Sequence, residues 1–391
     1  MTKLQAHPQT ATPEEVQAWL RLVEAPGVGP ATALRLLSAF GMPQEVLAQS
    51  YSALLPYCGE AAAKALLAPP PDALRELTER TLAWLEQPGR RLLTLADPAY
   101  PQALLEIHDP PPLLYAHGRL ECLRPPALAM VGARHATQQG MRDAERFAQA
   151  LAEAGLALGI DGAAHRGALM AGEAGAGTIA VIGTGADRVY PPAHRDLAHE
   201  IGQSGLILSE FPLGAPPLAE HFPRRNRLIA GLARGVLVVE AAVQSDSLIT
   251  ARMAAESGRE VFAMPGSIHA PLSKGCHALI KQEAKLAESA QDILEELRIQ
   301  PRTAKPAAGK TQAGKASAAK PALASASRAS PDALPAPAAA LLAVLDAAPL
   351  TLDELSARAG LRADEAGAGM LALELAGRAE SLPGGRYRRL D

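Results

Sequence analysis

The chain has 391 residues, of which 48% are hydrophobic and 20% charged, so it is long enough for two or three domains with a sizeable core. Its formal net charge of -3 excludes a protein that binds nucleic acid through bulk basicity, and its three widely spaced cysteines exclude a disulfide framework. Neither a signal sequence nor an apolar stretch long enough to span a bilayer is evident, so we expect a cytoplasmic protein.

Residues 1–90 are predicted to form a helical domain. Thr12 followed by Pro13 is a typical helix start, and apolar residues then recur at helical spacing as far as about Leu85. The turn Ala25–Pro30 resembles the hairpin of SAM-like, helix-hairpin-helix domains, whose glycines bring backbone N–H groups close to phosphates. It also fits a plain interhelical turn, because no lysine follows within the next helical turn.

Residues 91–299 are predicted to form an α/β core with an extended Rossmann-like, doubly wound and mainly parallel sheet. Its first part, up to Pro126, is rich in proline and predicts an irregular connector. Short apolar runs then alternate with helical segments, a pattern typical of parallel strands covered by helices on both faces. The predicted strands are Leu128–Val131, Leu156–Leu158, Thr178–Ile182, Leu206–Leu208, Val236–Val239 and Val261–Ala263.

Such sheets bind ligands at the carboxyl ends of their strands, which makes the following loops the candidate site. After the fourth strand the chain reaches a cluster of three arginines, Arg224, Arg225 and Arg227, at the start of a predicted helix. Free N–H groups and the helix dipole favour an anion there, and guanidinium groups suit phosphate oxygens. We therefore predict a surface that binds a phosphate backbone, in which the arginines contact phosphates and Phe222 stacks on an unpaired base. Its predicted residues are Arg134, Gly183, Gly185, Phe222, Arg224, Arg225, Asn226, Arg227, Ser245 and Ser247. The alternative is an arginine cluster bonded to neighbouring carboxylates such as Glu220.

Other chemistries have weaker support in this sequence. The dinucleotide fingerprint GxGxxG is absent after the first strand, and GxxxxGKS/T is absent throughout. The acid–base candidates are Asp161, His165, Glu210 and Glu240, but Asp161 fits a helix N-cap, and His165 lacks a partner nucleophile and fits a buried structural hydrogen bond. Cys276, His277 and His269 match no closed zinc pattern. We expect no metal, no cofactor and no catalytic residue.

The last part of the chain predicts a linker and a second small domain. Residues 300–332 consist mainly of Ala, Ser, Pro, Lys and Gly, which is typical of a disordered, basic linker. Residues 333–391 predict three helices followed by a hairpin, the pattern of a winged-helix domain. Its third helix, around Glu365 to Ala376, carries no base-reading Arg, Asn or Gln, so DNA contact, protein interaction and a structural role all remain open.

Several runs of residues resemble the DNA-processing protein A (DprA/Smf) family. They are VGARHATQQG from Val131, IDGAAHRGAL from Ile160, TIAVIGTGADRVYPPAHRDL from Thr178, FPRRNRLIAGLARGVLVVEA from Phe222 and LELAGRAESLPGGRYRR from Leu373. The resemblance implies a non-catalytic, homodimeric protein that binds and protects incoming single-stranded DNA during natural transformation. It also implies that the protein loads the RecA recombinase in place of single-strand-binding protein. The DNA-pocket positions of the family match Arg134 and the run Phe222 to Arg227.

An enzyme is the alternative function, as a nucleotide-cleaving N-glycosidase on a related Rossmann-like fold. Its PGGxGTxxE motif is not matched, because the nearest stretch, Met264 to His269, lacks the glycines and the glutamate.

The chain also departs from the DprA/Smf pattern. A turn similar to SGxARG is absent before Ile160, so one pocket arginine has no counterpart. Ala133 replaces a serine, and Asp246 stands where the family favours glycine, which puts a carboxylate near the predicted phosphate edge. Gly275 to His277 differs from the usual GTNxLIRQG run.

Overall fold

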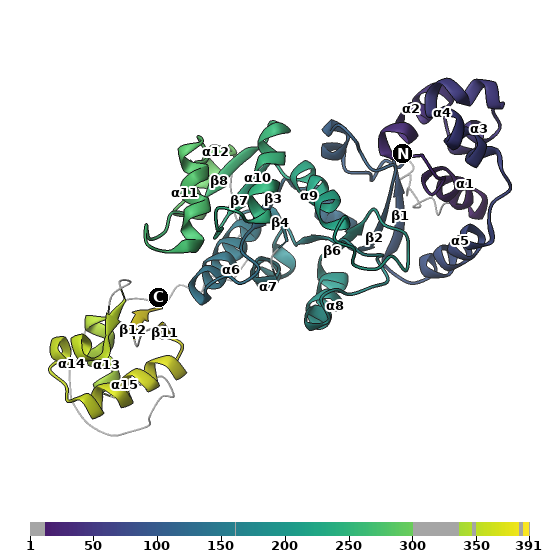
Figure 1. The fold of residues 1–391 in the computed structure, drawn as a ribbon. Coiled ribbons are helices and arrows are strands. Elements are labelled where there is room, and N and C mark those ends of the chain that lie inside the picture. The colour runs from purple at the N-terminus through teal and green to yellow at the C-terminus, as the bar shows by residue number, and fades with distance from the viewer. Residues whose placement is uncertain (1–11, 161, 300–335, 346–348, 383–385, 391) are drawn as a thin grey trace, which may run out of the picture. The chain divides into compact units, whose positions relative to one another are not determined.

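A computed structural model describes residues 12–160, 162–299, 336–345, 349–382 and 386–390 (Figure 1). The chain divides into two compact units, Met1–Ala304 and Lys305–Asp391. The predicted linker, residues 300–332, and Asp161, the predicted N-cap, lie outside the described residues. Within the described ranges, no helix has the length and apolarity needed to cross a membrane.

The helical segment at the N-terminus is confirmed. Its helices are α1 (Pro13–Val23), α2 (Pro30–Phe40), α3 (Pro43–Leu47), α4 (Tyr51–Leu67) and α5 (Asp72–Leu85). Thr12 and Glu15 form a reciprocal capping box at the start of α1. The turn between α1 and α2 uses Gly27 at φ +86°, a conformation that favours glycine, and Gly29 as the N-cap of α2.

A four-stranded sheet follows, with strand order β1-β2-β6-β5. Its strands are β1 (Arg90–Thr94), β2 (Leu113–Gly118), β5 (Ile179–Val181) and β6 (Leu206–Ser209), and short 3-10 helices η1 (Gln102–Glu106) and η2 (Leu120–Leu123) accompany them. The expectation of an irregular connector before Pro126 was wrong, because β1 and β2 are antiparallel strands. Their apolar residues form short runs between prolines, and they are buried by Trp19 and Trp84 of the helical segment.

The second sheet has strand order β4-β3-β7-β8-β9 and is parallel throughout. It consists of β3 (Ala127–Val131), β4 (Ala157–Ile160), β7 (Gly235–Val238), β8 (Glu260–Ala263) and β9 (Lys285–Leu286). Alternate residues of β3 enter two different hydrophobic clusters, with Ala129 and Val131 in one and Leu128 and Met130 in the other. Both faces of the sheet are therefore covered, which confirms the doubly wound, mainly parallel prediction.

The helices of the α/β core alternate with these strands. They are α6 (Gln138–Glu153), α7 (Gly162–Met170), α8 (Arg195–Ser204), α9 (His221–Leu232), α10 (Asp246–Glu256), α11 (Lys274–Lys281) and α12 (Ala290–Glu296), with 3-10 turns η3 (Gly172–Ala174), η4 (Pro192–His194) and η5 (Pro271–Ser273). Strand β4 lies against β5, so the two sheets adjoin each other. Strand β4 continues through Gly159 to Ile160, so the Gly-rich turn that the family pattern places before Ile160 is absent.

The second unit has the predicted winged-helix fold. Its elements are α13 (Ala336–Val344), β10 (Leu350–Thr351), α14 (Leu352–Ala359), α15 (Ala363–Leu375), β11 (Ala379–Leu382) and β12 (Arg386–Arg389). The three strands form an antiparallel sheet of order β10-β12-β11. Leu341, Leu355 and Leu373, one from each helix, are fully buried and join the helices in one core.

Candidate functional site

Helix α9 carries the predicted arginine cluster and divides it between two faces. Pro223 is tolerated because it lies in the first turn, where a backbone N–H has no helical partner. Residues three apart in a helix share a face, so Arg224 and Arg227 lie together, and Phe222 lies with Arg225. The two faces have different surroundings.

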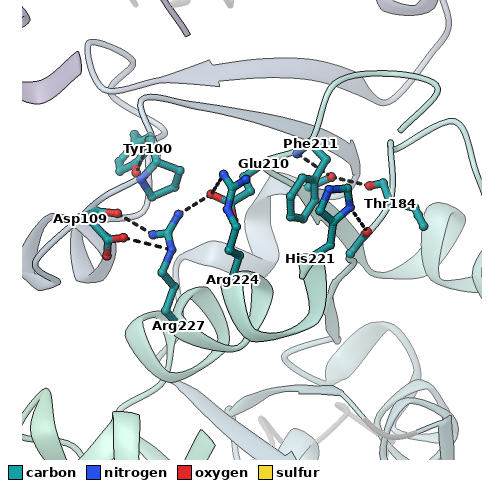
Figure 2. A network of polar contacts seen from close by, with 11 residues as sticks. Tyr100, Asp109, Thr184, Glu210, Phe211, His221, Arg224 and Arg227 are labelled. Carbon is teal, nitrogen blue, oxygen red and sulfur yellow. Dashed lines mark hydrogen bonds and ion pairs between the residues drawn. The ribbon is translucent and has the colours of Figure 1, made fainter. Parts of the chain in front are cut away.

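Arg227 is committed to neighbouring carboxylates inside the protein. Its side chain is 15% exposed, it pairs with Glu210, and its Nε lies 3.3 Å from Oδ2 of Asp109 (Figure 2). It also donates a hydrogen bond to the backbone carbonyl of Asp109. For Arg227 the alternative interpretation, an arginine bonded to carboxylates, is therefore the one observed, although the partners are Glu210 and Asp109 rather than Glu220.

Glu210 follows β6 directly, and its side chain is only 3% exposed. Burial raises the pKa of this carboxyl group, whereas the guanidinium groups of Arg227 and Arg224 oppose that shift. One carboxylate oxygen, Oε1, is buried without a hydrogen-bond partner. Glu210 is thus a buried ion whose charge depends chiefly on Arg227.

Arg224 remains open to solvent. Its side chain is 51% exposed and lies 3.7 Å from Glu210, a looser contact than that of Arg227. Its guanidinium lies 5.1 Å from the centre of the Phe211 ring, and that ring stacks on His221 with centroids 3.9 Å apart (Figure 2). The stack holds a cation at the surface in a defined position while leaving its outer N–H groups available to an anion.

Gly183 and Gly185 are buried and serve packing between loops. Nδ1 of His221 lies 3.0 Å from the carbonyl oxygen of Gly183, and the N–H of Gly185 donates to the carbonyl of Ala215 at 3.1 Å. A Cβ atom at Gly185 would lie 2.6 Å from the carbonyl oxygen of Pro212, so a side chain there would force the loops apart. Their role in the observed structure is to let the β5 and β6 loops approach each other.

The other face of α9 turns toward β5. Nη1 of Arg225 donates to the carbonyl oxygen of Val181, the last residue of β5, at 3.2 Å. Phe222 is partly buried, and its ring centroid lies 6.2 Å from that of Tyr190. Asn226 is buried within the helix packing. Arg225 and Phe222 therefore lie together near the carboxyl end of β5.

Arg134 is an exposed cation at the carboxyl edge of the second sheet. Arg134 follows β3, is 78% exposed and pairs at 2.5 Å with Asp246, which opens α10 and is itself exposed. Ser247 is buried and donates to the carbonyl of Gly132 at 2.6 Å, while Ser245 caps α10. The serines thus hold the helix start in place, whereas Arg134 and Asp246 are open to solvent.

The acid–base candidates within the described residues have structural partners. Nδ1 of His165 lies 2.7 Å from Oγ1 of Thr178, so the predicted buried hydrogen bond is confirmed. Burial lowers the pKa of this imidazole to about 3. Glu240 accepts hydrogen bonds from the N–H and the hydroxyl of Thr137 at the start of α6. His277, which the sequence offered only as a possible metal ligand, has its Nε2 3.0 Å from the carbonyl oxygen of Gly266.

Sequence reasoning missed three residues that shape this surface. Asp109 lies in the proline-rich stretch whose strands were not predicted, so nothing linked it to α9. Phe211 and Tyr190 lie within family-like runs, but their ring contacts join segments that are distant in sequence. The one signal in the sequence was the scarcity of aromatic residues, 3% of the chain, which makes each of them a candidate for stacking.

Comparison with known proteins identifies relatives of both units. The sequence pattern described as DNA recombination-mediator protein A matches residues 91–298, and that of the DprA winged helix domain matches residues 325–385. Protein Smf of Escherichia coli K12 is 42% identical over 325 residues, which cover 80% of this chain and 81% of that protein. DNA processing protein DprA of Streptococcus pneumoniae is 50% identical over 208 residues, covering 52% of this chain and 73% of the relative. The X-ray structure of DprA from Streptococcus pneumoniae is similar with a TM-score of 0.62 at 38% identity, over 73% of this chain and 98% of that chain.

Replacing Arg227 by Ala is expected to destabilise the first unit in a pH-dependent way. The variant must bury Glu210 with Arg224 as its remaining close cation, so at neutral pH the free energy of unfolding should fall by about 3–5 kcal/mol. Removing Arg227 raises the pKa of the folded carboxyl group further. The destabilisation should therefore shrink as the pH falls through that raised value toward the ordinary glutamate pKa, because the folded state takes up the proton first.

Both tryptophans, Trp19 and Trp84, lie in the first unit, so their fluorescence during denaturation at several pH values measures this change. Arg75→Ala is the control, because its ion pair with Asp72 is exposed. A destabilisation by Arg227→Ala that is equal at all pH values would contradict the buried-carboxylate account.

Proposed function

We infer that this chain, which belongs to the DNA recombination-mediator protein A family, binds single-stranded DNA through the exposed arginines of its α/β core. The observation that carries the proposal is Arg224, a half-exposed guanidinium held over an aromatic ring in the second turn of α9. Arg134 adds a second exposed cation after β3. Such arginines contact the phosphate backbone and not the base edges, so binding should depend on salt and hardly on sequence.

The biological role that we propose is the mediation of recombination. The family description names a recombination mediator, and the sequence resemblance implies that such proteins protect incoming single strands during natural transformation. On this proposal the chain loads RecA onto the strand and displaces single-strand-binding protein. We further propose that it acts as a homodimer in the cytoplasm, where its three free cysteines stay reduced.

A non-catalytic role fits the described side chains. An N-glycosidase needs a carboxyl group free to act on the ribose or on a water molecule. Glu210 is instead held by Arg227, and Glu240 by Thr137. No observation favours the enzymatic alternative, so we propose binding as the activity of this surface.

Removing the two exposed arginines is expected to weaken strand binding. Arg134→Ala and Arg224→Ala should each lower the affinity for a labelled oligothymidine by about ten- to hundredfold, since each charge-assisted contact contributes roughly 1.5–3 kcal/mol. The slope of log affinity against log salt should become shallower by about 0.7 for each phosphate that is no longer neutralised. Fluorescence anisotropy across a salt series measures both quantities, with Arg75→Ala as the control for the removal of an exposed arginine elsewhere. Unchanged affinity in the double variant would refute the placement of the site.

Asp246→Asn is expected to tighten binding. The exposed Asp246 carboxylate occupies Arg134 and competes with a phosphate for it. Because exposed ion pairs contribute about 0.2–1 kcal/mol, affinity should rise roughly two- to fivefold at low salt, and the gain should fade at high salt. The same anisotropy titration measures the change. A gain that persists at high salt would point to a cause other than charge competition.

The mediator role predicts faster RecA assembly on covered DNA. Oligothymidine is coated with single-strand-binding protein, and the binding of fluorescently labelled RecA is followed with and without this chain. The wild type should accelerate RecA binding, whereas the Arg134→Ala, Arg224→Ala double variant should not. Normal strand binding by the wild type without acceleration would refute the loading role and leave the binding proposal standing.

A further inference from the structure

Tyr190 presents an aromatic ring to solvent next to the arginine-bearing helix. Its side chain is 53% exposed, while its ring centroid lies 6.2 Å from that of Phe222 at an interplanar angle of 55°. This is the spacing of aromatic rings in direct contact. Phe222, predicted from the sequence to stack on a base, is thus the more buried of the two rings, and Tyr190 is the one that faces outward.

Two hydrogen bonds anchor the loop that carries Tyr190 on the side that precedes the ring. The hydroxyl of Thr184 donates to the carbonyl of Arg188 at 3.2 Å, and Oδ1 of Asp187 accepts from the N–H of Gly214 at 2.8 Å. Pro191 and Pro192 follow Tyr190 and restrict the backbone directly after it. An exposed ring held on a restrained loop loses little conformational entropy when a ligand packs on it.

The charge around the ring pair suits a polyanion. Arg188, two residues before Tyr190 in the same loop, is exposed, whereas Arg225 of α9 is part-buried and donates to the carbonyl of Val181. A base that packs on Tyr190 would therefore keep its own phosphate close to a cation. Protein surfaces that bind single strands combine these two features, a basic track and an aromatic platform.

We propose that Tyr190 is a base-stacking residue of the strand-binding surface and that Phe222 supports its ring from behind. The rings already touch, so a base stacks on the outer face of Tyr190 rather than between them. This proposal rests on the proposed binding of single-stranded DNA. It adds selectivity for unpaired over paired DNA, because bases within a duplex are covered by their neighbours, and it adds no sequence preference, because every base has a π-face.

The test compares two strands of equal length and charge, an oligothymidine and a strand made of abasic sites. The full chain is measured as wild type, Tyr190→Ala, Tyr190→Phe and Tyr57→Ala by fluorescence anisotropy. Tyr57 is the matched control, because it is a partly exposed ring that contacts Phe40 with centroids 5.0 Å apart in the helical segment. Thermal unfolding of each variant verifies that the fold is retained.

Tyr190→Ala should weaken oligothymidine binding by about tenfold, within the range for removal of one stacked base, while Tyr190→Phe and Tyr57→Ala should bind like the wild type. On the abasic strand Tyr190→Ala and the wild type should be equal, and the salt dependence should not change, since every cation that faces a phosphate is still present. Equal affinities on oligothymidine, or the same weakening on both strands, would overturn the stacking role. If the wild type binds neither strand, the proposed function itself fails, which is a separate result.

Discussion

The burial of the Glu210 carboxylate is the constraint on which the candidate site depends. A carboxylate that is 3% exposed and lacks a partner for one oxygen is costly to keep charged unless a cation lies against it. Arg227 supplies that cation and reaches Asp109 as well, so α9 is tied both to the end of β6 and to the segment that precedes β2. This double tie fixes the rotation of α9. Once Arg227 points inward, Arg224 must lie one turn earlier on the same face, and Phe222 and Arg225 must face β5.

The degree to which each ion pair is buried decides which arginines are available to a ligand. A buried pair is strongly coupled, and a phosphate would have to displace Glu210 from a site that already satisfies Arg227. The pair of Arg134 with Asp246 is exposed and therefore weak, so a phosphate can replace the carboxylate at small cost. Arg224 lies between these cases, because it is half exposed and 3.7 Å from Glu210. Fewer arginines of the run from Phe222 to Arg227 are therefore available to a phosphate than the sequence suggests.

Sequence patterns located the edge of the sheet that carries the candidate residues. They did not show which of these residues are buried and which are exposed. Strands such as β3 were predictable because a strand covered on both faces is a continuous apolar run, whereas β1 and β2 were missed because prolines interrupt their surroundings. The run from Phe222 to Arg227 was found as a helix start. Its separation into an inward Arg227 and an outward Arg224 follows from contacts with Glu210 and Asp109, which lie 17 and 118 residues away in sequence. Likewise, the glycines of Gly183-Thr184-Gly185 are explained by close loop packing, which no local pattern reveals.

On our proposal, the absence of the family's turn before Ile160 makes the ring pair of Tyr190 and Phe222 more important for binding. The resemblance implies an arginine-bearing turn before Ile160, and here β4 continues through Gly159 to Ile160 without that turn. A binding surface that lacks this cation would depend more on the exposed arginines and on the two rings, Tyr190 and Phe222. Stacking differs from the missing ionic contact in one physical respect, because it is insensitive to salt. A chain that replaces part of its phosphate contacts by stacking would therefore lose less affinity for unpaired DNA as the ionic strength rises.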